Sequence, residues 1–130
     1  FKVFDDIKSN AIKKSIWMKL PFWKNIISKM LLKAVDPDTM KKVKTSAPFK
    51  PTKSSYTKAI LEEFDTKQKK LVTYIYELDG YDHSQIVVPS PINSKIVYPL
   101  TDAFTILWKH QIRHYNQAKA LTNLPAFPTA

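Results

Sequence analysis

The chain has 130 residues with a single glycine, no cysteine and a formal net charge of +10. This length fits one domain with an appendage, and a hydrophobic content of 44% is too high for a disordered protein. The lack of cysteine excludes disulfide scaffolds and thiolate metal sites, and a single glycine excludes the glycine-rich loops that bind phosphates.

The charge is distributed unevenly along the chain. The first 58 residues hold 14 lysines and four aspartates, whereas the remaining 72 residues hold seven bases and seven acids. Arg113 is the only arginine, so the other 20 basic residues are lysines, which act as point charges and not as bidentate readers of bases or phosphates. The front of the chain is therefore expected to attract a polyanion through its electrostatic field.

The first predicted part is a basic amphipathic helical arm over residues 1–45. Apolar residues recur at three- and four-residue steps over 12–34, which is the period of one helix face. Pro21 lacks an amide donor and disfavours helix at the preceding residue. The sequence therefore predicts a break near Leu20 and a second helix over 22–34.

A short third helix and a connector complete the front half. Asp36 followed by Pro37 is typical of a helix start, and predicts a basic helix that continues to Lys44. Prolines, serines and threonines then dominate the sequence and predict an extended connector over 46–55. We place the domain boundary there, before a small α+β domain over 56–130.

The neutral half of the chain predicts a small antiparallel sheet covered by helices. Val72, Tyr74 and Tyr76 alternate with other β-branched and apolar residues, which favours a strand, and Gly80 marks the turn after it. In chain order the patterns predict a helix over 56–64, strands over 71–78, 84–88 and 95–98, and a long helix over 101–121 that Thr101 caps. The predicted fold class is α+β, with about three strands.

The strongest apolar surfaces of this half predict its core. One face of the first strand and one face of the last helix carry large side chains at the strand and helix periods. The residues expected to pack together are Tyr74, Tyr76, Phe104, Trp108, Ile112 and Tyr115.

One segment resembles a known family. The predicted order of helix, three strands and helix, with Gly80–His83 between the first two strands, is similar to the double-stranded-RNA-binding domain. The family's glycine-rich, lysine-paired start of the last helix is missing, and Pro99–Ala103 stands in its place. The resemblance implies RNA binding, without the residues that clamp phosphates across the major groove.

Catalytic chemistry has little support in the sequence. The acids at 62, 63 and 65 lie near three lysines and are typical of a solvated helix face, and no serine or cysteine nucleophile stands in a known context. Three histidines have spacing that suits metal ligation only weakly, because the glutamate that usually follows the first histidine is missing; they are His83, His110 and His114. We therefore expect no enzyme, no cofactor and no small-molecule substrate.

The basic arm admits three interpretations. Eight lysines suit phosphate binding, namely Lys13, Lys14, Lys24, Lys29, Lys33, Lys41, Lys42 and Lys44. Apolar side chains beside them suit an interfacial helix on a membrane or a partner protein, namely Trp17, Phe22, Trp23, Met30 and Leu31. In the third interpretation the apolar stripe packs on the chain's own core and the lysines only face solvent.

From these patterns we predict a non-catalytic structural subunit of a larger assembly, with protein partners, anchored by the arm to RNA of a ribonucleoprotein such as an organellar ribosome. The alternative is a peripheral membrane or lipid-contacting subunit, for example of a respiratory complex. Because the chain begins with Phe1 and not with methionine, we expect a processed protein or a fragment. An intracellular location is expected, and a mitochondrial one if a presequence has been removed.

Overall fold

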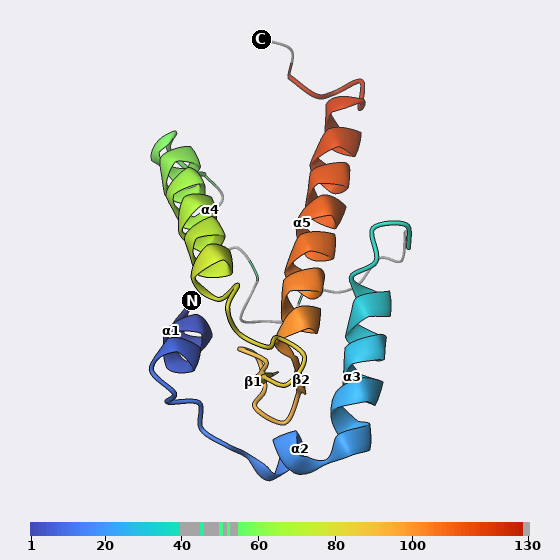
Figure 1. Cartoon of the computed structure of the whole chain (residues 1–130). Helices are drawn as coiled ribbons and strands as arrows, with labels where there is room; N and C mark the ends of the chain where they lie inside the picture. Colours follow the sequence, from blue (N-terminus) through green and yellow to red (C-terminus); the bar gives the residue numbers. More distant parts are fainter. Residues whose placement is uncertain (40–44, 46–49, 51, 53–54, 129–130) are drawn as a thin grey trace. The chain divides into compact units, whose positions relative to one another are not determined.

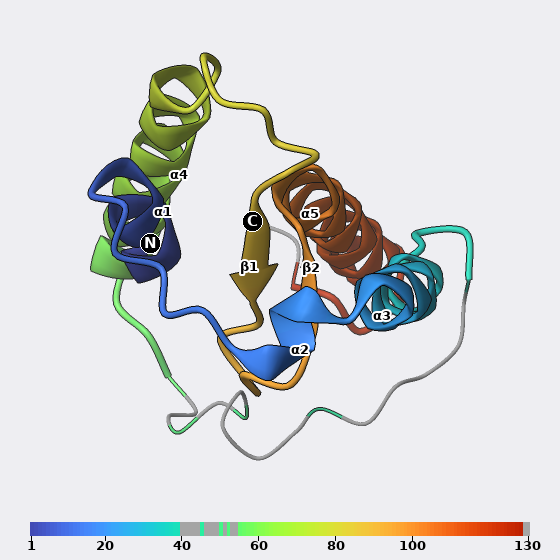
Figure 2. The same cartoon turned by 60° about the horizontal axis from the view of Figure 1, so that its bottom comes forward.

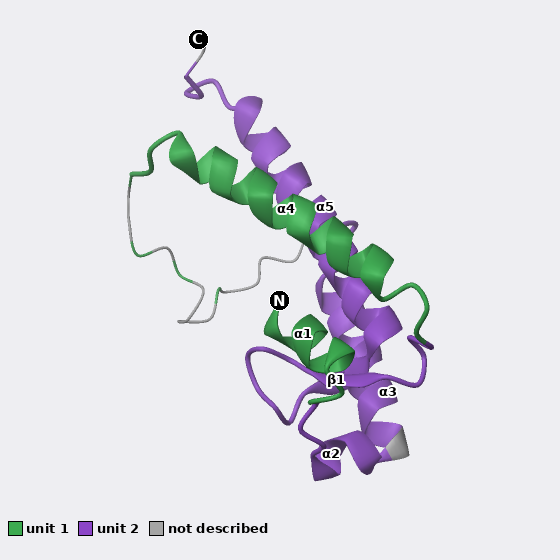
Figure 3. Cartoon of the chain, turned by 60° about the vertical axis from the view of Figure 1, so that its left-hand side comes forward, with its two compact units in different colours: residues 1–11, 41–81 green, residues 12–40, 82–130 purple. Residues whose placement is uncertain are grey.

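The computed structural model describes residues 1–39, 45, 50, 52 and 55–128, and its fold class is α+β (Figure 1). The chain forms two compact units, each built from separate segments (Figure 3). Unit 1 comprises Phe1–Ala11 and Lys41–Tyr81, and unit 2 comprises Ile12–Met40 and Asp82–Ala130. Each unit therefore combines residues from the predicted arm with residues from the predicted domain. The predicted boundaries at 1–45, 46–55 and 56–130 remain predictions.

Unit 1 pairs a short helix with a long one. Helix α1 (Lys2–Lys8) buries Phe4 and Ile7, and helix α4 (Ala59–Glu77) buries Tyr74. The Tyr74 ring lies 5.2 Å from the ring of Phe4, and the Tyr74 hydroxyl donates a hydrogen bond to Asp5 Oδ1. These contacts attach α1 to the C-terminal part of α4.

The strand predicted over 71–78 is wrong, because these residues belong to α4 and to the turn after it. The segment fits both periods: Val72, Tyr74 and Tyr76 alternate, but Leu71, Tyr74 and Leu78 are also spaced by three and four residues, as on one helix face. In the structure the segment is helical, and the face that carries Tyr74 and Leu78 is the buried one. Tyr74 and Leu78 are buried, whereas Tyr76 is 77% exposed. The expected turn at Gly80 is present directly after the helix.

The hydrogen bond in unit 1 predicts an unusual tyrosine titration. Hydrogen bonding to Asp5, with burial as the second cause, raises the pKa of Tyr74 to about 12 from 10.0. A raised pKa in the folded state means that this stabilisation is complete below about pH 10 and is lost as the pH rises towards 12. We expect Tyr74→Phe to remove the tyrosine that ionises last in an absorbance titration of the folded protein. Loss of an ionisation near pH 10, with the last ionisation still present, would contradict the bond.

Unit 2 begins with two helices separated as the proline predicts. Helix α2 (Ile16–Lys19) is a single turn, Leu20 is extended, and helix α3 (Pro21–Ala34) starts with proline at its first position. Proline suits this position because its missing amide would have had no partner inside the helix. The break predicted near Leu20 is confirmed.

A two-stranded antiparallel sheet and a long helix complete unit 2. Strand β1 (Val87–Pro89) pairs with strand β2 (Val97–Pro99), with Val88 opposite Tyr98. Helix α5 (Leu100–Thr122) follows β2 directly, and α3 packs against both β2 and α5 (Figure 2). The buried side chains of this unit are Ile27, Ser28, Val88, Val97, Tyr98 and Leu100.

Several sequence-based expectations for the neutral half need correction. The structure has two strands in its described residues and not three, so the strand order of the double-stranded-RNA-binding domain is not present. The last helix occurs as predicted, but Pro99 and not Thr101 holds the N-cap position. Trp108 and Tyr115 are 60% and 65% exposed, so they lie outside the core that we predicted for them.

Residues 40–44 of the third predicted helix lie outside the described residues. Its expected start forms a turn, in which the Thr39 amide donates to the Asp36 carbonyl at 3.2 Å. Among the described helices, none is long and apolar enough to cross a membrane.

Candidate functional site

The lysines of α2, α3 and the segment before them lie in a stretch of the chain that contains no acidic residue. Five are exposed, and we call them the lysine surface: Lys13, Lys14, Lys19, Lys29 and Lys33. No aspartate or glutamate occurs between Asp6 and Asp36, and none of the five forms an ion pair with a described residue. Their charges are therefore available to an external anion.

The other predicted lysines have different positions. Lys24 is half-buried, and residues 41, 42 and 44 lie outside the described part of the chain. Lys19 was not predicted as a site residue, although it lies one position before the helix break. Its position in the lysine-rich segment could have identified it as a site residue.

An apolar face lies beside these lysines. Phe22, Ile26 and Met30 follow one another at four-residue steps on α3, and they are 80%, 60% and 54% exposed. Ile16 of α2 and Leu20 of the break are also exposed. We call these five residues the apolar patch; of them the sequence had singled out only Phe22 and Met30.

The two tryptophans of this region point to internal partners. The ring centroids of Trp17 and Trp23 lie 5.5 Å apart, and Trp23 Nε1 donates a 2.8 Å hydrogen bond to the carbonyl of Lys95. Both tryptophans are half-buried, as is Leu31. In this structure the tryptophans connect α2 and α3 to the hairpin, and a role for them in contact with a partner stays a prediction.

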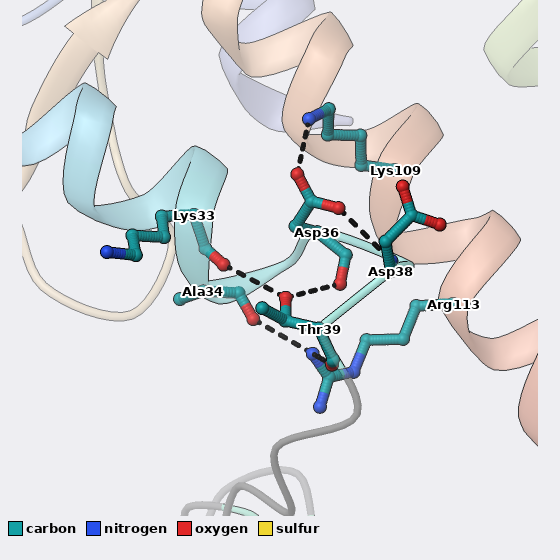
Figure 4. Close-up of polar contacts among 7 residues, drawn as sticks. All are labelled: Lys33, Ala34, Asp36, Asp38, Thr39, Lys109 and Arg113. Atoms are coloured by element: carbon teal, nitrogen blue, oxygen red, sulfur yellow. Dashed lines mark hydrogen bonds and ion pairs between the residues drawn. The ribbon is translucent and has the colours of Figure 1, made fainter.

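A set of polar contacts fixes the C-terminal end of α3 on α5 (Figure 4). Lys109 Nζ lies 2.9 Å from Asp36 Oδ2, and Arg113 donates to the carbonyls of Ala34 and Thr39 at 3.0 and 3.3 Å. The bond from Lys109 is the main cause that lowers the pKa of the Asp36 carboxyl. The stabilisation from this pair is thus present at neutral pH and is lost as the pH falls through the lowered pKa.

One further contact holds α3 in place. The hydroxyl of the buried Ser28 donates to Asp102 in the first turn of α5. Together with the contacts of Arg113, this bond holds α3, which carries Lys29 and Lys33, on α5. Arg113 acts here as a structural residue, which the sequence did not indicate.

The histidines divide into a pair and a separate residue. His110 and His114 lie one turn apart on α5 with their Nε2 atoms 3.0 Å apart, and His114 Nδ1 lies 2.9 Å from Gln117 Oε1. Burial, followed by the charges of His114 and Arg113, lowers the pKa of His110. His83 packs its ring edge-on against Phe104. Within the described residues, no group of three potential metal ligands is present.

Comparison of the chain with protein families, with curated proteins and with solved structures found no match.

Proposed function

We propose that the chain is a non-catalytic structural subunit of a larger assembly and attaches to a polyanionic surface through the lysine surface. The observation that carries this proposal is the set of five exposed lysines, none of which forms an ion pair with a described acid. RNA and an anionic bilayer are the two polyanions that this chemistry fits.

The mechanism of attachment follows from the fact that the basic residues are lysines and not arginines. Lysine ammonium groups attract phosphates without fixing their orientation, so binding is expected to be strong at low salt and indifferent to base sequence. Binding releases condensed counterions, which gives affinity a steep dependence on salt concentration. The contacts of Asp36, Ser28 and Arg113 support this role because they hold α3 on α5.

The test is the double variant Lys29→Gln/Lys33→Gln, with Lys58→Gln/Lys119→Gln as a control that removes the same charge from exposed sites elsewhere. Affinity for a single-stranded RNA is measured at several salt concentrations. If both lysines contact phosphates, the first variant should reduce the slope of log affinity against log salt by about 1.4 units, and the control should change it little. Equal slopes in the two variants would show that the lysine surface has no special role.

A second candidate function rests on the histidine pair. Two nitrogen ligands of a tetrahedral zinc ion lie about 3.3 Å apart, given bond lengths of about 2.05 Å. The Nε2 atoms of His110 and His114 are 3.0 Å apart, so a small rotation lets both bind one ion. The contact of His114 Nδ1 with the Gln117 oxygen supports the tautomer in which His114 Nε2 carries no proton and has a lone pair for a metal ion. The remaining ligands would come from water or from another chain.

This candidate predicts zinc binding by the native chain. Calorimetric titration with zinc should give one site that is lost in both His110→Ala and His114→Ala. His83→Ala is the control, because its ring packs against Phe104. Equal zinc affinity in all three variants would contradict the pair as a metal site.

A further inference from the structure

Helices α2 and α3 carry members of both the apolar patch and the lysine surface, and this combination limits which polyanion can bind there. Phe22, Ile26 and Met30 are exposed on α3, which also presents Lys29 and Lys33 to solvent. Exposed apolar patches rimmed by polar residues mark interaction sites in soluble proteins. A binding partner of this surface therefore has to bury apolar side chains and, at the same time, place negative charges beside the lysines.

The chemistry of the side chains separates RNA from lipid. An RNA strand offers phosphates to lysines and base faces to aromatic rings, and the patch holds one aromatic residue, Phe22, beside aliphatic and thioether side chains. An anionic bilayer can bury the aromatic, aliphatic and thioether side chains below its headgroups. The phosphates and carboxylates of the headgroups can bind the lysines at the same time. No acidic residue occurs between Asp6 and Asp36, so no negative charge within this segment reduces its attraction to an anionic leaflet.

We infer that the patch around Phe22 and Ile26 inserts into the interface of an anionic lipid bilayer while the lysine surface contacts its headgroups. This inference rests on the proposed attachment to a polyanion and names the polyanion. Long lysine side chains reach the headgroups from a helix whose apolar residues lie deeper. Trp17 and Trp23 stay in their internal contacts, so the inserted residues are Phe22 and its aliphatic neighbours.

The experiment measures binding of the full chain to vesicles of phosphatidylcholine that contain about one-third phosphatidylserine. Phe22→Ala/Ile26→Ala removes two members of the patch, and Phe64→Ala/Ile75→Ala removes the same side chains from exposed positions on α4. We expect the first variant to bind at least about tenfold more weakly and the control to bind like the native chain. Lys29→Gln/Lys33→Gln should weaken binding about 25-fold at low salt, or about fivefold per lysine. Circular dichroism of each variant serves as the control that it is folded.

Four results would overturn the inference. Binding to RNA but not to these vesicles would refute it and leave the proposed function intact, whereas binding to neither would refute both. Equal binding to vesicles of pure phosphatidylcholine would show that the lysines have no role. Equal loss in the patch variant and the α4 control would show that insertion is not specific to the patch.

Discussion

Replacing Leu100 by alanine is expected to lower the free energy of unfolding of unit 2 by about 3 kcal/mol. Leu100 is fully buried at the junction of β2 and α5, and its amide donates a 2.8 Å hydrogen bond to the carbonyl of Ile86. Truncation of a buried leucine costs the transfer of its methyl groups and leaves a cavity, which typically amounts to about 2–5 kcal/mol. All three tryptophans lie in unit 2, so their fluorescence during chemical unfolding reports on this unit.

The matched control for this prediction is Trp108→Ala. Trp108 lies two turns further along α5 and is 60% exposed, so its removal should cost less than about 1 kcal/mol although the side chain is larger. If Trp108→Ala destabilised the protein more than Leu100→Ala, the core of unit 2 would be centred on the face of α5 that the sequence indicated.

Trp23→Ala should be the second most disruptive substitution, with a loss of about 2–3 kcal/mol. The change removes the ring contact with Trp17 and leaves the Lys95 carbonyl without the donor Nε1. Loss of a large, partly buried aromatic side chain and of one hydrogen bond together account for this magnitude. Chemical unfolding followed by circular dichroism measures the effect without depending on the removed fluorophore.

Phe22→Ala provides the control at the neighbouring position. Phe22 is 80% exposed, and its removal should change the free energy of unfolding by less than about 0.5 kcal/mol. The two adjacent aromatic residues therefore separate stability from binding, because Phe22 belongs to the patch and Trp23 contacts Trp17 and the Lys95 carbonyl. A stability loss at Phe22 equal to that at Trp23 would contradict this division.

Elements with one dominant signal were predictable from the sequence. The proline-marked break at Leu20 and the helix that follows it were expected, and so was the long final helix. The segment 71–78 was not, since its apolar residues satisfy strand and helix periods together. The propensity of valine and tyrosine for strands was overridden when α4 continued through the segment and packed Tyr74 against α1.

The candidate site was predictable in charge but not in detail. The lysine surface follows from a segment that contains lysines and no acids, which composition alone reveals. The supporting contacts join residues more than 70 positions apart, such as Asp36 with Lys109 and Ser28 with Asp102, and no local pattern indicates them. The inward position of Trp23 likewise depends on the distant carbonyl of Lys95.

The salt dependence of binding of the native chain to the phosphatidylserine vesicles tests both parts of this surface at once. We expect affinity to fall steeply as salt screens the lysine surface, and a residual affinity, carried by Phe22 and Ile26, to persist at high salt. The residual part should disappear in Phe22→Ala/Ile26→Ala, and the salt-dependent part should shrink in Lys29→Gln/Lys33→Gln. An affinity that does not change with salt, or that is the same in all variants, would contradict the central claim that this surface attaches the protein to a polyanion.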